Sequence, residues 1–312
     1  MDKLSIRGKT ARHLVEVAHH FPLIKDCVND GTSRQKLYEK EKTWICPQHL
    51  NLEEIDMGEF KMELLSSTLQ DTQKDKGIIL QLHGGGYYGP IHNVYRDMAA
   101  LYIEVSDGMP VLSVDYRVAP DYPYPAALND TLKAYNWLQE QGYHPNRILV
   151  VGDSAGGGLA LCLGQYLRDH NLLMPAGFIT MSPWTDLATK GDSYVDNFDI
   201  DPIFGGTKES LVFQNEYYRL DSPENPYISP VYGDFYGFPP MLMQVGEREM
   251  LLSDTLQVAQ KAKDAGCMVK LHIYEGMFHV FQMGLLYYPE SKNAWIEVGK
   301  YIRYMKRDWE NV

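Results

Sequence analysis

The sequence of 312 residues has little cysteine and a deficit of positive charge. Its four cysteines, Cys27, Cys46, Cys162 and Cys267, show no C-x-x-C spacing, so we expect buried thiols, with Cys162 and Cys267 in helices. Lys and Arg total 29 against 41 Asp and Glu, which gives a formal net charge of −12. Such a chain would repel phosphate backbones and anionic lipids, so we expect no nucleic-acid and no membrane partner.

Long apolar runs are also missing. The longest stretch without Asp, Glu, Lys or Arg, residues 77–95, contains several glycines, histidines and a proline, and therefore cannot be a membrane-spanning helix. The first 20 residues carry charges throughout and lack the apolar core of a secretory signal peptide. We therefore expect a cytoplasmic protein.

The composition, 45% hydrophobic and 22% charged, is that of a globular protein, and the sequence has a regular alternation of patterns. From residue 77 onward, short apolar runs alternate with stretches of helical period, which predicts a mostly parallel sheet flanked by helices. The expected strands are Phe60–Leu65, Ile78–Leu82, Val111–Asp115, Ile148–Val151, Gly177–Met181, Met241–Val245 and Val269–Tyr274. The expected helices are Val94–Val105, Ala126–Gln141, Ser154–Arg168, Ser253–Ala265 and Ser291–Lys306.

Two regions break this alternation. Residues 1–58 have helical period and much charge, and residues 184–238 are rich in Tyr, Asp, Pro and Gly. The second region contains apolar side chains, Phe204, Leu211 and Tyr217 among them, that would be costly to leave in water. We therefore interpret both regions as a cap over the carboxyl edge of the sheet, where open α/β sheets bind ligands, and residues 59–312 as the catalytic domain, with 184–238 contributing to the cap.

The strongest motif is G-x-S-x-G at residues 152–156, directly after one expected strand and directly before an expected helix. A nucleophile elbow needs this context, because its strained strand-to-helix turn requires small residues around the serine. The helix also points its free N–H groups toward an oxyanion formed at the serine. This motif predicts Ser154 as a nucleophile.

A second motif, His83-Gly84-Gly85-Gly86, follows the expected strand Ile78–Leu82. Consecutive glycines free the backbone to aim N–H groups at one point, as an oxyanion hole requires. Neither GxxxxGK[ST] nor GxGxxG occurs, so a nucleotide-binding loop is not favoured.

A nucleophilic serine needs a neutral imidazole as base. After the elbow only three histidines remain, His170, His272 and His279. His170 ends the elbow's own helix and His272 lies within an expected strand, whereas His279 follows the strand Val269–Tyr274 at the carboxyl edge of the sheet. Geometry therefore favours His279.

The imidazole in turn needs a carboxylate, and three follow the strand Met241–Val245. Asp254 falls in the first turn of the next helix, where a carboxylate has a structural use, and Glu247 is placed to brace the loop. Glu249 lies in the middle of this loop. We favour Glu249 as the acid and keep Asp254 as the alternative.

HGGG, GDSAGG and the order serine, acid, histidine together resemble the α/β-hydrolase fold, and within it the bacterial hormone-sensitive-lipase-like carboxylesterases. Further strings support the resemblance from Phe60 to the C-terminus, namely DYRVAP and YPYPAA at residues 115–127, SPWTDL at 182–187 and GMFHVF at 276–281. Many members have aspartate in an acid-x-Pro-Leu string, where this chain has Glu249-Met250-Leu251. The resemblance implies an α/β-hydrolase fold with a helical cap.

Carried over to this chain, the resemblance implies Ser154 as nucleophile and His279 as base. It also implies an oxyanion hole formed by Ala155 with glycines of Gly84, Gly85 and Gly86, of which Gly85 and Gly86 are the preferred donors. The implied reaction is hydrolysis of a carboxylic ester through an acyl-enzyme. Because the cap segment is rich in aromatic residues and Tyr87 and Tyr88 directly follow the glycines, we expect limited room at the serine and therefore short-chain acyl esters or small lactones as substrates. The expected partners are a small-molecule ester and, as an option, a second copy of the chain in a homodimer.

This chemistry requires no metal or organic cofactor. His13, His19 and His20 lie in an amphipathic segment at a spacing that favours solvated side chains over metal ligation. Two alternatives remain open. One is an amide hydrolase, for example of aryl formamides, and the other is a small-molecule receptor on a hydrolase scaffold, which the complete set of triad candidates disfavours.

Overall fold

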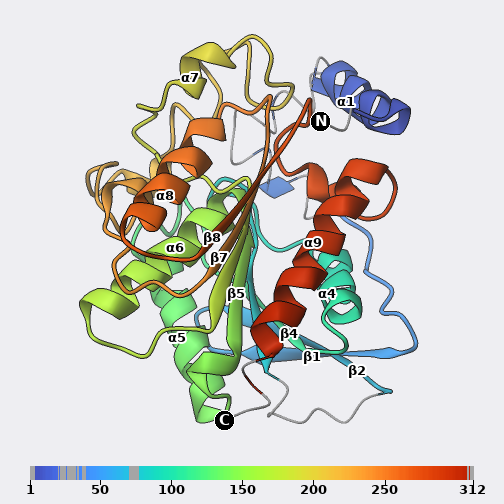
Figure 1. Ribbon diagram of the computed structural model, residues 1–312, viewed down its shortest axis with the longest axis vertical. Helices are drawn as coiled ribbons and strands as arrows, with labels where there is room; N and C mark the ends of the chain where they lie inside the picture. The colour runs from blue at the N-terminus through green and yellow to red at the C-terminus, as the bar shows by residue number, and fades with distance from the viewer. Residues whose placement is uncertain are drawn as a thin grey trace.

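The computed structural model describes residues 4–19, 21, 26, 33, 35–36, 40–69, 77–307 and 309 (Figure 1). In this part of the chain, eight strands form one sheet in the order β1-β2-β4-β3-β5-β6-β7-β8. The strands from β3 to β8 pair in parallel, whereas β1 and β2 are antiparallel to their neighbours. The mostly parallel sheet with flanking helices confirms the predicted fold class.

The bounds of the elements agree closely with the sequence pattern. The strands are β1 Leu50–Asp56, β2 Lys61–Ser67, β3 Ile78–Leu82, β4 Val111–Asp115, β5 Ile148–Asp153, β6 Gly177–Met181, β7 Met241–Gly246 and β8 Val269–Tyr274. The α-helices are α1 Ile6–His19, α4 Asn93–Val105, α5 Ala126–Glu140, α6 Ser154–Asp169, α7 Ser193–Asp196, α8 Leu252–Asp264 and α9 Pro289–Lys306. None of these helices combines the length and the apolarity that crossing a bilayer requires.

Helices cover both faces of the sheet. In Figure 1, α4 and α9 lie on one side of the strands and α5, α6 and α8 on the other. The side chains of β3 alternate accordingly, with Ile78 and Leu80 in one apolar core and Ile79 in the other. Double-sided burial explains why the inner strands are almost wholly apolar in sequence.

Strand β1 was not predicted from the sequence, because residues 1–58 were expected to form part of the cap. Leu50 is buried at the start of β1, but Asn51, Glu53 and Glu54 are exposed. An antiparallel edge strand needs only partial burial, so its sequence shows no apolar run. The sheet therefore begins at residue 50 and not after residue 58, and the division of the chain into a cap and a catalytic domain remains a prediction.

The prediction of buried cysteine thiols is confirmed in part. Cys162 lies buried in α6, as predicted. Cys267 is only half-buried and follows α8 instead of lying in a helix, because Gly266, with a φ of +84°, ends the helical path. Cys46 is also half-buried, and Cys27 falls outside the described residues.

Helix α1 and the segment 184–238 lie at one end of the molecule (Figure 1). The segment contains α7 and two short 3-10 turns, Glu216–Tyr218 and Pro230–Tyr232. Its apolar side chains pack as predicted, with Phe204, Leu211, Val212 and Tyr217 buried and Phe213 and Tyr218 half-buried. Helix α1 is attached to the C-terminal part of the chain, because the backbone N–H of Ser5 donates to Glu290 at 2.6 Å and the Arg12 guanidinium donates to the carbonyl of Gly276 at 3.1 Å.

Candidate active site

The turn between β5 and α6 places Ser154 at the start of a helix. β5 ends at Asp153, and Ser154 is the first residue of α6, with a φ of +51°. A non-glycine residue rarely adopts this left-handed conformation, which here presents the hydroxyl at the carboxyl edge of the sheet. Gly156 makes the turn sterically feasible, because a Cβ there would lie 2.1 Å from the carbonyl oxygen of Leu82 in β3.

His279 lies beside this serine. Its Nε2 is 2.9 Å from Ser154 Oγ, and its Nδ1 is 3.0 Å from Glu249 Oε2. An ionised carboxylate only accepts hydrogen bonds, so Nδ1 carries the ring proton and Nε2 is the atom that accepts from the serine hydroxyl. The structure therefore brings three residues together that are 125 and 30 positions apart in the chain.

The carboxylate of Glu249 is fully buried and is held by several donors. Ser182 Oγ donates to Glu249 Oε1 at 2.7 Å, and the backbone N–H of Gly246 donates to the same oxygen. Asn197 Nδ2 fixes the loop by donating to the backbone carbonyl of Glu249 at 2.7 Å. These bonds leave Oε2 directed at His279.

Ser182 is a site residue that the sequence reasoning gave no role. Besides donating to Glu249, its Oγ accepts the backbone N–H of Val280 at 3.1 Å, so it joins the loop of the acid to the loop of the histidine. One signal was available, because Ser182 directly follows β6 and therefore lies at the same carboxyl edge as the other site residues.

The competing carboxylates have other partners. Asp254 lies in the first turn of α8, as predicted, and its Oδ2 accepts the backbone N–H groups of Thr185 and Asp186 at 2.7 and 2.8 Å. Burial, together with the nearby Asp186, raises the pKa of Asp254 well above its ordinary value. Glu247 accepts the N–H of Gly276 at 2.9 Å and so braces the histidine loop. Of the three, Glu249 is the one bonded to His279.

The oxyanion candidates divide into two groups. The N–H of Gly84 already donates to Asp153 Oδ1 at 3.1 Å, so Gly84 fits a structural role in the loop better than that of an oxyanion donor. Gly85 and Gly86 have φ angles of +106° and +66°, which favour glycine. In the described part of the chain, the N–H groups of Gly85, Gly86 and Ala155 are not used by another acceptor. They are therefore available for a charged oxygen near Ser154.

Two buried titratable groups lie beneath this glycine loop. Burial raises the pKa of Asp153 to about 7, and the nearby His279 opposes part of this shift. Burial likewise lowers the pKa of His83 to about 4, so its ring is neutral at physiological pH. The His83 ring stacks on Tyr116 with a centroid distance of 4.0 Å and thereby supports the start of the glycine loop.

The segment 184–238 contacts both halves of the site. Phe204 packs on the His279 ring with a centroid distance of 4.7 Å. Asn215 Nδ2 donates to the carbonyl of Gly86 at 3.0 Å, and Tyr217 stacks on Tyr87 at 3.7 Å. The walls around the reacting groups are therefore largely aromatic.

The remaining histidines lie elsewhere. His170 is exposed at the end of α6, and His272 faces Glu297 from β8. His13 is exposed beside Glu16, and His20 falls outside the described residues. Within the described ranges, no group of three or more His, Cys, Asp or Glu side chains is arranged to hold a metal ion.

Comparisons with known proteins agree on one family. Residues 79–283 match a family model described as alpha/beta hydrolase fold. An esterase of Acinetobacter venetianus is 36% identical over 72% of this chain and 74% of its own length, and an acetyl-hydrolase of Streptomyces hygroscopicus is 35% identical over 75% and 78%. The crystal structure of an esterase from the bacterial hormone-sensitive lipase family superimposes with a TM-score of 0.83 at 31% identity, covering 98% of this chain and 99% of that one.

Replacing Glu249 and Asp254, one at a time, by the corresponding amide tests which of the two carboxylates orients the imidazole of His279. We expect Glu249→Gln to reduce kcat by about 10⁴, because an amide no longer holds the required tautomer of the histidine. Asp254→Asn retains acceptors for Thr185 and Asp186 and should change kcat far less. Steady-state kinetics on one ester, with circular dichroism to verify folding, measures both, and a larger loss in Asp254→Asn would transfer the role of the acid to Asp254.

The raised pKa of Asp153 predicts a pH-dependent stability. Between its ordinary value of 3.8 and about 7, the unfolded chain releases this proton while the folded chain retains it, so stability falls as pH rises through this window. The free energy of unfolding of the wild type minus that of Asp153→Asn should therefore fall across it and level off above about pH 7. Urea titrations at several pH values measure this difference, and a flat or rising difference would show that burial does not raise this pKa.

Proposed function

This chain belongs to the α/β-hydrolase family, as a carboxylesterase of the hormone-sensitive-lipase type, and we propose that it hydrolyses short-chain acyl esters or small lactones through an acyl-enzyme on Ser154. One observation supports the proposal most. It is the unbroken series of hydrogen bonds from Ser154 Oγ through the His279 ring to the buried Glu249 carboxylate.

In the proposed mechanism, Ser154 Oγ attacks the ester carbonyl while His279 Nε2 takes the hydroxyl proton. The negative charge on the carbonyl oxygen is stabilised by the N–H groups of Ala155, Gly85 and Gly86. His279 then gives its proton to the leaving alcohol, and Ser154 remains acylated.

Hydrolysis of the acyl-enzyme reverses these roles. A water molecule gives a proton to His279 Nε2 and attacks the acyl carbon, and the imidazolium returns the proton to Ser154 as the acid leaves. Glu249 stabilises the imidazolium in both steps, and Ser182 and Gly246 hold the carboxylate in place while it does so.

Hydrolysis of an ester fits this site better than hydrolysis of an aryl formamide or a role as a small-molecule receptor. A receptor on this scaffold would need no bonded serine, imidazole and carboxylate, whereas all three are joined here. Relatives named esterase and acetyl-hydrolase support an ester over an aryl formamide. A cytoplasmic location and a homodimer stay predictions.

The proposed substrates have short acyl groups, because bulky side chains surround the reacting atoms. Phe204 packs against the base, and Tyr87, Tyr217 and Trp184 form an aromatic cluster next to the glycine loop. Tyr88 is anchored too, because its hydroxyl accepts the backbone N–H of Glu216 at 2.6 Å. Such packed walls leave limited room for an alkyl chain.

Removal of the nucleophile should abolish hydrolysis. We expect Ser154→Ala to lower kcat by about 10⁶ while Tm stays nearly unchanged, because only the reacting oxygen is lost. The matched control is Ser113→Ala, which removes a buried hydroxyl in β4 that bonds to Gln81, outside the proposed machinery. Activity of Ser154→Ala within tenfold of the wild type would contradict the mechanism.

Acyl-chain length tests the aromatic walls. We expect kcat/KM to be highest for acetyl to about hexanoyl p-nitrophenyl esters and to fall beyond, although each methylene that fitted would contribute up to ~0.8 kcal/mol by burial. A value of kcat/KM that still rises at ten or more carbons, about four beyond the expected limit, would mean that the aromatics line a long channel.

A further inference from the structure

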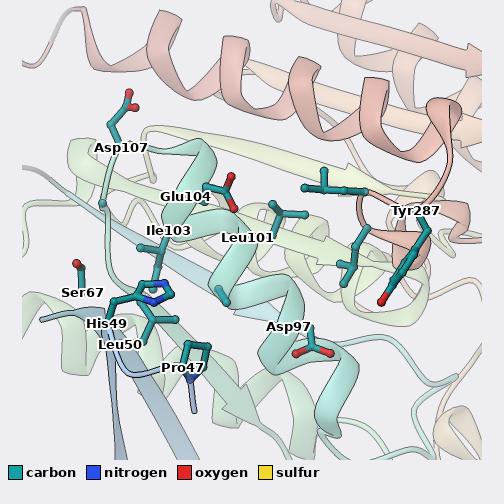
Figure 2. A pocket seen from close by; sticks show the side chains of 14 residues that line it. Pro47, His49, Leu50, Ser67, Asp97, Leu101, Ile103, Glu104, Asp107 and Tyr287 are labelled. Atoms are coloured by element: carbon teal, nitrogen blue, oxygen red, sulfur yellow. The ribbon is translucent and has the colours of Figure 1, made fainter. Parts of the chain in front are cut away.

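A groove of about 870 Å³ lies beside α4, and none of Ser154, His279 and Glu249 lines it. Figure 2 shows it from close by, with α4 between the chain around His49 and Leu50 on one side and Tyr287 on the other. Its lining comes from four segments of the chain, residues 47–50, Ser67, residues 97–108 and residues 285–287. A concave site of this volume is in the range that binds small organic molecules.

The floor and one wall of this groove are apolar. Leu50, Leu101 and Ile103 form buried parts of its lining. Leu286 and Tyr287 stand at the wall with 49% and 80% of their surface exposed. Two large apolar side chains held in water next to a buried apolar floor provide surface that a hydrophobic ligand body would cover.

The charged lining has one sign. Asp97, Glu104 and Asp107 are exposed at the groove, and its lining includes neither Lys nor Arg. Trp44 Nε1 donates to Asp97 at 2.9 Å, and among the described residues neither Glu104 nor Asp107 forms a salt bridge. Asp107 lies at the edge of the groove, where, unlike Glu104, it also borders the basic side chains of Lys300, Arg303, Lys306 and Arg307. The carboxylates therefore attract a positive charge held near the apolar floor.

We propose that this groove is a second binding site, separate from the proposed catalytic one, for a small organic cation with an apolar body. The apolar lining would bury the body, and Glu104 and Asp107 would attract the ammonium group. A second copy of this chain fits less well, because it brings the same acidic surface and a net charge of −12.

Calorimetric titration of the full chain with octyltrimethylammonium bromide, below its micelle concentration, tests the proposal. We expect saturable binding of one cation, and at least tenfold weaker binding of octanoate, which has the same chain length and the opposite charge. The double variant Glu104→Lys/Asp107→Lys should weaken binding of the cation by about tenfold. The matched control is Glu140→Lys on α5, which also reverses an exposed carboxylate but lies on the other face of the sheet.

A second variant tests the apolar wall of the groove without changing a charged residue or a residue of the buried core. Tyr287→Ala removes a mostly exposed side chain, so the fold should be unaffected and binding of the cation should weaken severalfold. Addition of the cation should also leave the KM of a short ester unchanged, because the catalytic serine stays free.

Several results would overturn the proposal. Equal losses in Glu140→Lys and in the double variant would indicate attraction to the whole anionic surface. Competitive inhibition of ester hydrolysis, with affinity unchanged in Tyr287→Ala, would place the cation in the catalytic pocket instead. Binding of a basic amphipathic peptide at much lower concentration, sensitive to the same variants, would identify a protein partner in place of a small molecule.

Discussion

The site depends on the buried carboxylate of Glu249 and on the hydrogen bonds that hold it. An ionised carboxylate that loses water must be compensated, and Ser182, Gly246 and His279 supply three polar contacts. The same contacts fix the ring of His279 in the orientation that allows Nε2 to accept from Ser154. The hydrogen bonds that stabilise the carboxylate of Glu249 therefore also orient the imidazole toward the nucleophile.

The parallel sheet explains how residues so far apart in sequence meet. Ser154, Ser182 and Glu249 follow β5, β6 and β7, and His279 follows β8, so neighbouring strands present them at one edge. The segment 184–238 adds packing from the other side. Asp201 accepts the backbone N–H groups of Phe204 at 3.1 Å and Met250 at 2.7 Å, and thereby ties the aromatic wall to the loop of the acid.

Much of the sheet and of the candidate site could be predicted from the sequence, because the relevant signals are local. Apolar runs between glycines mark the inner strands, and the elbow motif marks Ser154, since both reflect the demands of the adjacent backbone. Strand β1 lacked such a signal, because it is held by pairing with β2 and most of its own side chains are not buried. The roles of Ser182 and Asn197 depend on contacts across 67 and 52 positions of the chain, and only the folded structure reveals them.

The central claim is that Ser154, activated by His279 and Glu249, is the group that attacks the substrate. Titration with diethyl p-nitrophenyl phosphate, followed by peptide mapping, tests it most directly, because the reagent transfers its phosphoryl group to an activated serine and is not readily hydrolysed from it. The account predicts one diethylphosphoryl group on Ser154 and loss of esterase activity in proportion to the labelling. Labelling of another residue together with lost activity, or full activity of protein labelled at Ser154, would contradict it.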